Sequence, residues 1–287
     1  MFINRISKDK IAAKTMLLLT ILACSSLLLI FAGLIYKSLP VIEKSSFSQL
    51  LFSDQWHPLK GEFGMLPFIS STLWVTGVSV IIAVPLCILS AIYLSEYAHK
   101  RILQFIFPII DILAGIPSVI FGVWGLILIV PIFGYSILSG GIVLAVMIVP
   151  VVIHVMIEVI KTVPSELRDA SLSLGATKWQ TIKFVVVKKA LPGIIAGIVL
   201  GLSRAFGETM AVLMVVGNVV KIPHSVMDAG YPLPALIANN YGEMMSIPMY
   251  DSALMLSALI LFIIVVIFNI FSRIILIRIE RNVGYNS

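Results

Sequence analysis

Two ionisable residues, Arg204 and Glu208, lie four positions apart inside a long apolar stretch of the chain, 192–218. A charge at the middle of a bilayer costs about 2.5–3.5 kcal/mol on insertion scales, so charged residues found there usually have a role. Arginine carries a permanent charge and a rigid fork of donors that suits the oxygens of phosphate-like anions. A neighbouring carboxylate can hold that fork, or accept a hydrogen bond from a protonated anion and so discriminate against sulfate. The pair predicts an oxyanion site within the membrane; the alternative is a buried ion pair that only fixes helix packing.

The residues around this pair predict one continuous membrane-spanning helix over 192–218. Small residues repeat every four positions, a spacing that lets helices approach closely: Gly193, Gly197, Gly201 and Ala205. At about 100° per residue, Arg204 and Glu208 fall on the same face as this stripe, so we expect them to face sister helices rather than lipid. Arg204 lies about 18 Å along the axis from Pro192, near the middle of the membrane. The spacing of four also allows the two side chains to pair along the helix.

A second informative stretch is 161–191. Pro164 and Ser165 signal the start of a short helix with Ser165 as its N-cap, Gly175 signals its end, and Thr177 can cap a second short helix. Apolar side chains follow both helices: Leu167, Ala170, Leu174, Trp179, Ile182 and Phe184. We therefore expect an amphipathic helix pair joined by a glycine turn. Such a pair either lies on the lipid surface or inserts into a groove on a soluble partner, and the periodicity fits both uses.

The composition of the 287 residues is that of a membrane protein. Hydrophobic residues make up 60% of the chain, charged residues only 12%, and the mean hydropathy is +1.09. This excludes a soluble enzyme, a disordered chain and a secreted disulfide scaffold. Cys24 and Cys87 lie in apolar runs without metal-ligand spacing. No Walker A, GxSxG or HExxH pattern is present, so we expect this chain neither to hydrolyse ATP nor to bind a cofactor or metal.

Six apolar stretches are long enough to cross a bilayer: 16–36, 67–95, 106–130, 137–160, 192–218 and 252–277. The first follows a basic leader, but its apolar run is longer than that of a signal peptide, so we expect an uncleaved span. Of 20 Lys and Arg residues, 15 fall on the side of the N-terminus, and the opposite side holds only Lys37, Lys44, Lys60 and Lys221. By the positive-inside rule, both termini are cytoplasmic. The same asymmetry accounts for the net charge of +6 without nucleic acid.

The two long external segments, about 37–66 and 219–251, carry Pro, Gly and aromatic residues. They suit a surface that docks an external partner or caps a cavity, and the aromatic residues are equally suited to anchoring at the lipid interface: Trp56, Tyr231, Tyr241 and Tyr250. Hydroxyls at the external end of the second span either line an access path or hydrogen-bond their own helix: Ser70, Ser71, Thr72 and Thr76.

The third and fourth spans hold further polar residues. Gly115, Pro117 and Ser118 predict a kink in the third span, which serves gating or packing. Near the cytoplasmic ends of these spans lie three titratable residues, of which the last two share a helix face: Asp111, His154 and Glu158. They suit a proton relay, an inner gate, or simple snorkelling at the interface.

The stretch 161–191 resembles the EAA loop of ABC-importer permeases. The resemblance rests on Asp169-Ala170-Ser171, then Gly175-Ala176 and later Ala190-Leu191-Pro192-Gly193, with Asp169 and Ser171 in place of the usual Glu and Ala and Lys188 in place of a frequent Pro. In that family the loop forms coupling helices that seat in the ATP-binding subunits. The resemblance thus implies a docking role for Glu166, Asp169, Ala170, Ser171, Gly175 and Ala176.

The segment from Arg204 to Asn218 resembles the phosphate-specific (Pst) importer permeases, and its Glu-Thr-Met-Ala-Val and Gly-Asn motifs are more similar to the C-type subunit than to the A-type. Further similar segments are 72–76, 91–98 and 114–122. The resemblance implies an all-α polytopic fold with six transmembrane helices, the type I ABC-importer permease (MetI-like) fold. It also implies a substrate pathway that includes Arg204, Glu208, Thr209, Ser203, Thr72 and Ser118.

The partners implied are a homologous A-type permease, two ATP-binding subunits that hold ATP and Mg, an extracytoplasmic phosphate-binding protein, inorganic phosphate and the lipid bilayer of the bacterial cytoplasmic (inner) membrane. The chain would divide into a cytoplasmic tail (1–15), a first span with its external loop (16–66), a permease domain (67–278) and a second tail (279–287). Three alternatives are a permease for another oxyanion such as sulfate, molybdate or phosphonate, a secondary carrier or channel, and a sensor or scaffold. A secondary carrier often shows internal repeats, and none is visible here.

Overall fold

The computed structural model describes residues 5–242, 247 and 249–284. The ends of the two expected tails, 1–4 and 285–287, lie outside the described residues, as do 243–246 and 248 of the second external segment. The described chain is almost entirely helical. Strands β1 (Trp56–His57) and β2 (Glu62–Phe63) pair antiparallel in a small hairpin around the 3-10 helix η1 (Pro58–Lys60).

Five helices of the described chain are long and apolar enough to span a membrane, and they are built on α1 (Arg5–Lys44), α3 (Leu66–Ile92), α7 (Ile137–Lys161), α10 (Val187–Gly207) and α13 (Tyr250–Gly284). The bent pair α4 (Lys100–Gly115) and α5 (Ser118–Leu128) makes a sixth if it is taken as one span. Short helices join them: α2 (Phe47–Phe52), α6 (Val130–Phe133), α8 (Ser165–Ser173), α9 (Lys178–Thr181), α11 (Met210–Leu213) and α12 (Leu233–Asn240). Two π-helical turns continue the long helices: η2 (Tyr93–Tyr97) after α3 and η3 (Ile182–Val186) before α10.

The third predicted span, 106–130, is not one kinked helix. Its two halves, α4 and α5, meet at 96°, and α4 begins at Lys100, earlier than expected. The bend lies at Ile116, whose extended backbone (ψ 130°) is what a following proline favours, because the Pro117 ring clashes with a helical conformation of the residue before it. The predicted kink is therefore confirmed in position, and the break it makes is larger than a kink.

The bundle is organised around α7, which packs against α3, α10 and α4. The glycine stripe of α10 faces α7, because a Cβ at each glycine would meet a valine of α7: Gly193 with Val159, Gly197 with Val155, and Gly201 with Val152. The predicted close approach of this face to another helix is confirmed. It packs α10 closely along α7.

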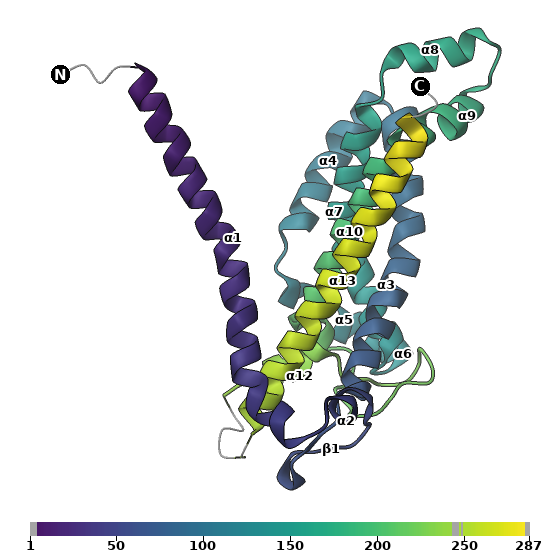
Figure 1. Ribbon diagram of the computed structural model, residues 1–287. Helices are drawn as coiled ribbons and strands as arrows, with labels where there is room; N and C mark the ends of the chain where they lie inside the picture. The colour runs from purple at the N-terminus through teal and green to yellow at the C-terminus, as the bar shows by residue number, and fades with distance from the viewer. Residues whose placement is uncertain (1–4, 243–246, 248, 285–287) are drawn as a thin grey trace.

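Helix α1 differs from the other long helices because most of its length stands apart from the bundle (Figure 1). It packs on α13 towards its C-terminal end, where Phe31 and Phe262 stack at 5.5 Å and Val41 is buried. Its earlier turns expose a row of leucines: Leu17, Leu18, Leu22, Leu28 and Leu29. Such a surface is stable in lipid or against another apolar chain and not in water.

Different helices and chain segments lie at the two ends of the bundle (Figure 1). The start of α1, the end of α13 and the short helices α8 and α9 lie at one end, and α2, β1 and α12 lie at the other. The basic stretch 161–191, the start of α1 and the end of α13 therefore lie on the same side of the molecule. This is the arrangement that the charge distribution predicts.

Candidate functional site

The predicted single helix over 192–218 is wrong, because α10 begins earlier, at Val187, and ends at Gly207. Glu208 is extended (φ −73°, ψ 127°), and a new short helix, α11, begins at Met210. The Glu208 carboxylate, one residue before the N-cap Thr209, accepts the backbone N–H of Ala211 in the first turn of α11 at 3.2 Å. Arg204 and Glu208 are consequently not an i,i+4 pair on one helix. The sequence does carry a signal for this break: Gly207, which can end a helix, is followed directly by Glu208, whose carboxylate can accept a hydrogen bond at the start of the next one.

Arg204 lies in the last turn of α10, where the helix dipole favours a cation. Its side chain is half-buried. Among the residues that the structure describes, no carboxylate oxygen lies within the 4.0 Å of an ion pair from its guanidinium. The alternative of a buried Arg204–Glu208 ion pair is therefore absent from this arrangement, and the guanidinium fork is available for another anion.

The helix break at 207–209 is itself informative. Non-helical backbone at membrane depth is tolerated only where protein covers it or where it lines a water-filled cavity. Gly207 is exposed, and a Cβ placed on it would meet nothing within 4 Å. Glu208 and Thr209 are half-buried, and the Thr209 hydroxyl reaches back to the Gly207 carbonyl at 3.4 Å. The backbone at Gly207 is thus open, and the side chains on either side of it, Arg204 and Glu208, are half-buried in this chain.

Thr72 and Glu208 are brought together at one narrow pocket, which is also lined by Pro232 and Pro234. The pocket has room for about one water molecule. The Thr72 hydroxyl is already used, because it donates to the Phe68 carbonyl at 2.7 Å and accepts the Leu233 N–H at 2.9 Å. Thr72 therefore links α3 to the start of α12. It has this structural role in addition to lining the pocket beside Glu208.

The other predicted pathway residues lie apart from that pocket. Ser203 faces α13, where its hydroxyl donates to Asn269 Oδ1 at 3.3 Å. Ser118 is the first residue of α5. This helix packs against α11, since a Cβ at Gly122 would lie 3.1 Å from Ala211 Cα. Ser118 is therefore linked to the break only through the packing of its helix.

The helix pair predicted over 161–191 is confirmed in its main features. Gly175 has φ +83°, and the Gly175 and Ala176 N–H groups donate to the Leu172 and Ser171 carbonyls at 2.9 and 3.3 Å, which is a glycine-terminated helix end. Thr177 and Gln180 form a reciprocal capping box at the start of α9. Two details are wrong. Pro164 occupies the N-cap of α8, and Ser165 is its first helical residue. The second helix is not a separate short one, because α9 continues through η3, which holds Ile182 and Phe184, into α10 as a single span from Lys178 to Gly207.

The predicted docking residues lie mostly at the surface. Glu166, Asp169, Ala170 and Gly175 are exposed, and Ser171 and Ala176 are half-buried. The Ser171 hydroxyl contacts the Thr181 hydroxyl at 2.9 Å and joins α8 to α9. Large apolar side chains are exposed beside them: Leu172, Leu174, Trp179 and Phe184. Exposed apolar groups on a charged helix pair indicate a surface that something else covers.

Sequence reasoning missed one pair of residues here, Arg168 and Glu96. The Arg168 guanidinium of α8 binds the Glu96 carboxylate of η2 with Nη2–Oε1 at 2.7 Å, across 72 positions of the chain. The sequence offers only a weak signal for this contact, a carboxylate at the end of an apolar span and an arginine in a basic loop.

Asp111 and His154 do meet, with His154 Nδ1 3.7 Å from Asp111 Oδ1. Glu158, which shares the helix face of His154, pairs with Lys161 at 2.9 Å instead. Both pairs are largely exposed in this chain. Within the described residues, no group of three or more His, Cys, Asp or Glu side chains is placed to hold a metal ion.

At the opposite end of the molecule, three of the four external aromatic residues are packed inside. Trp56 makes edge contacts with Phe68 at 4.8 Å and with Tyr250 at 5.9 Å, and Tyr231 packs on Phe68. Tyr231 and Tyr250 are buried, so they belong to the core of the layer at this end of the molecule, named the external layer after its predicted side, rather than to a belt of exposed aromatic residues. The fourth, Tyr241, is exposed.

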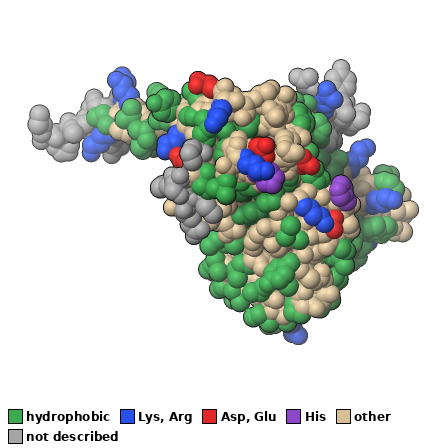
Figure 2. All heavy atoms as spheres, turned by 90° about the horizontal axis from the view of Figure 1, so that it is seen from below, with side chains coloured by type: hydrophobic (Ala, Val, Ile, Leu, Met, Phe, Trp, Pro, Cys, Tyr) green, Lys and Arg blue, Asp and Glu red, His purple; other side chains and the backbone are tan. Residues whose placement is uncertain are grey.

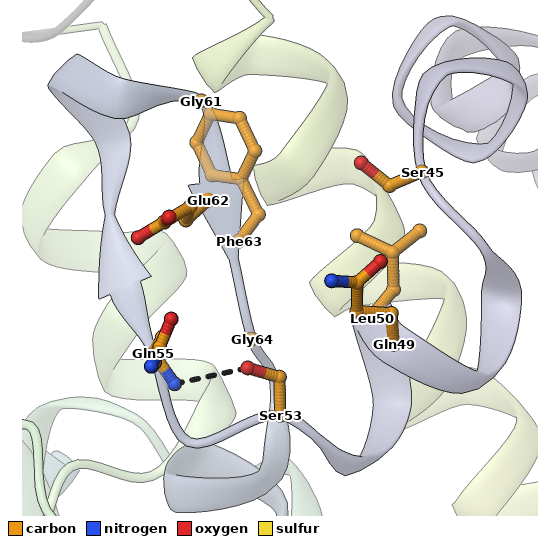
Figure 3. A pocket seen from close by; sticks show the side chains of 9 residues that line it. All are labelled: Ser45, Gln49, Leu50, Ser53, Gln55, Gly61, Glu62, Phe63 and Gly64. Atoms are coloured by element: carbon orange, nitrogen blue, oxygen red, sulfur yellow. Dashed lines mark hydrogen bonds between the residues drawn. The ribbon is translucent and has the colours of Figure 1, made fainter.

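The surface of this external layer is mixed. Figure 2 shows it from below, with side chains of both charges dispersed among apolar and other ones. A polar pocket opens between α2 and the hairpin, lined by Ser45, Gln49, Ser53, Gln55 and Glu62 around the Phe63 ring (Figure 3). The Gln55 N–H donates to Ser53 Oγ at 3.1 Å in its wall. The segment 37–66 therefore presents polar groups at the end remote from α8 and α9.

The chain matches the family described as binding-protein-dependent transport system inner membrane component over residues 83–285. Phosphate transport system permease protein PstC of Xylella fastidiosa (strain 9a5c) is 35% identical over 260 residues, which cover 81% of this chain and 80% of that protein. Probable ABC transporter permease protein YqgH of Bacillus subtilis (strain 168) is 39% identical over 238 residues, 78% of this chain and 76% of that protein.

Solved structures share the fold at lower identity. A chain of the MetNI methionine ABC transporter in an inward-facing conformation has a TM-score of 0.60 and 21% identity, covering 73% of this chain and 93% of that chain. A chain of a bacterial alginate ABC transporter has a TM-score of 0.60 and 17% identity, covering 94% and 96%. The matched family spans most of the sequence, and relatives exceed 30% identity. This chain therefore belongs to the binding-protein-dependent transport system inner membrane components, the permease subunits of ABC importers.

Proposed function

We propose that this chain is the C-type permease subunit of an importer that carries inorganic phosphate across the bacterial cytoplasmic membrane by alternating access. As a member of its family, it is a transport component rather than an enzyme. The observation that carries the proposal is the Arg204 guanidinium, which lies three residues before the helix break at Gly207 in an apolar span, without a carboxylate partner among the described residues. Relatives over 30% identical, including the PstC of Xylella fastidiosa, are named as phosphate transport permeases, which supports phosphate as the substrate.

The chemistry of the break suits a partly protonated tetrahedral anion. The Arg204 fork can donate two parallel hydrogen bonds to phosphate oxygens. Glu208 bonds the Ala211 N–H through Oε1 alone, so its second oxygen can accept the hydrogen of a phosphate hydroxyl. A fully deprotonated anion has no such hydrogen and would meet the carboxylate as a like charge. Thr209, Ser203, Thr72 and Ser118 are assigned to the same pathway; Thr209 and Thr72 lie beside Glu208, whereas Ser203 and Ser118 lie apart from its pocket.

The partners follow from the two ends of the molecule. We assign α8 and α9 to the groove of an ATP-binding subunit, with contacts by Glu166, Asp169, Ala170, Ser171, Gly175 and Ala176. The exposed apolar residues of this pair support a protein groove as much as a lipid surface, and family membership favours the groove. The external layer, with its polar pocket, faces an extracytoplasmic phosphate-binding protein, and the exposed face of α1 faces lipid or the homologous A-type permease.

Orientation and domain roles complete the proposal. The positive-inside rule puts the α8–α9 end, and with it both termini, in the cytoplasm. The segment 67–278 forms the transport unit with its coupling loop at 161–191, and 16–66 adds a first span and external loop between the tails 1–15 and 279–287. ATP and Mg belong to the two ATP-binding subunits, and this chain binds no cofactor.

The test is uptake of labelled phosphate by the whole complex in proteoliposomes. Arg204→Ala should abolish uptake and Arg204→Lys should reduce it, because an ammonium group lacks the planar fork. Arg273→Ala, at the far end of α13, is the matched control and should transport normally. Normal uptake by Arg204→Ala in an intact complex would refute the assignment. Competition by sulfate, molybdate or phosphonate as strong as that of unlabelled phosphate would show that another oxyanion is the substrate.

A further inference from the structure

One guanidinium links α8 to the ends of two spans. Arg168 points from α8 back to the bundle, where its Nη2 and Nε donate to Glu96 Oε1 at 2.7 and 3.2 Å. Glu96 belongs to η2, the π-helical turn that continues α3. The same guanidinium donates to three backbone carbonyls at and just after the end of α7, those of Ile160, Val163 and Pro164. One side chain therefore connects α8 with the ends of α3 and α7.

This ion pair is the least exposed of those in the described part of the chain. The side chains of Glu96 and Arg168 are 9% and 22% exposed, whereas Glu158 and Lys161, at the same end of the bundle, are 57% and 44% exposed. A shielded, bidentate pair is less screened by salt and more rigid than a surface pair. Such a pair is suited to transmitting a displacement of α8 to the ends of α3 and α7.

Few other contacts hold α8. None of its nine residues is buried, and it packs mainly against η3 and α9. The hydroxyls of Ser171 and Thr181 join α8 to α9, and α9 has its own attachment to η2, because Lys178 Nζ lies 4.4 Å from the centre of the Tyr97 ring. The two docking helices thus form one unit that holds η2 through two cationic side chains.

We propose that the Arg168–Glu96 ion pair is the link through which movement of α8 and α9 reorients α3 and α7 together. This inference rests on the proposed docking of ATP-binding subunits at α8 and α9. The π-helical turn suits the role, since such turns are irregular points of a helix that often occur at functional sites. Arg168 and Glu96 are positioning residues, because they act on the spans and do not touch phosphate.

The test measures phosphate taken up per ATP hydrolysed by the whole complex in proteoliposomes. Glu96→Gln and Arg168→Met each leave the opposite charge unpaired and should weaken assembly as well as coupling. The double variant Glu96→Gln with Arg168→Met leaves no unpaired charge, so the ATP-binding subunits should co-purify as in the parent. Its uptake of phosphate per ATP hydrolysed should nevertheless fall by about 5- to 150-fold, the factors that correspond to typical coupling free energies between two sites. Glu158→Gln with Lys161→Gln, the exposed pair, is the control and should leave the ratio unchanged.

Parent-like coupling in the assembled double variant would overturn the proposal, because the ion pair would then serve stability alone. Hydrogen exchange of the α8 amides provides a second readout that needs no substrate. In the double variant these amides should exchange faster than in the control, and unchanged exchange would also overturn the proposal. If the parent complex carries no phosphate, the proposed function fails, whereas the exchange measurement still decides whether the ion pair holds α8 to the spans.

Discussion

Gly193 is the position at which one added methyl group should separate two spans. A Cβ there would lie 3.0 Å from Val159 Cβ and 2.7 Å from Val159 Cγ2, and closer still to Cγ1. Rotation of the valine moves its two Cγ atoms, but its Cβ at 3.0 Å remains tight, so α7 and α10 must still move apart by a few tenths of an ångström. Overpacking of this kind costs about 1–3 kcal/mol. Replacing a helical glycine by alanine otherwise gains up to about 1 kcal/mol.

Gly77 of α3 provides the matched control, since a Cβ there meets nothing within 4 Å. We expect Gly193→Ala to lower the free energy of unfolding in mixed detergent micelles by about 1–3 kcal/mol relative to Gly77→Ala. Val159→Ala combined with Gly193→Ala should recover most of that loss, a coupling of about 1 kcal/mol or more in the double-mutant cycle. Equal stability of the two glycine variants, or additive effects in the cycle, would refute the close packing of α7 on α10.

Three further predictions concern the turn, the external layer and its pH dependence. Gly175→Val forces a β-branched residue to φ +83°, a strain of about 1–2 kcal/mol, and should lower phosphate uptake per ATP; unchanged coupling would count against docking at α8 and α9. Thr72→Val leaves the buried Leu233 N–H without its acceptor and should cost about 1–3 kcal/mol of unfolding free energy, whereas Thr72→Ser should be nearly neutral. The His224 N–H and the Lys221 ammonium hold the pKa of Asp228 below its ordinary value of 3.8. Its stabilisation of the external loop is therefore present above that value and lost as the pH falls through the lowered pKa, so protection of the His224 and Ser225 amides should drop on acidification in the parent and not in Asp228→Asn.

Local signals in the sequence predicted the docking helices well. Gly175 and the Thr177 cap act within a few residues, so their geometry depends little on the rest of the fold; the reciprocal bond from Gln180 was not predicted. The glycine stripe of α10 was also readable, because its spacing of four selects one face of any helix. Both features are properties of a single element.

Breaks within apolar stretches were harder to predict. Hydropathy shows that a segment belongs in the membrane and does not show where its backbone leaves the helix. The sequence therefore predicts only a kink where the structure has the 96° bend after Gly115, and it predicts a continuous helix across the stop at Gly207. Contacts between distant segments were hidden altogether. The ion pair of Arg168 with Glu96 joins residues 72 positions apart, and the burial of Trp56 against Tyr250 needs both external segments in place.

The central claim, that Arg204 meets phosphate in transit, is tested most directly by chemical rescue. Cys24 and Cys87 are the only two cysteines of the chain, so Arg204→Cys can be made in a background in which both are replaced and transport is retained. The variant should take up no phosphate, and a cationic, water-soluble thiol reagent should restore part of the uptake, whereas an anionic reagent of the same size should restore none. Failure of both reagents to modify the cysteine from either side of the membrane, or equal uptake after the two modifications, would contradict the claim.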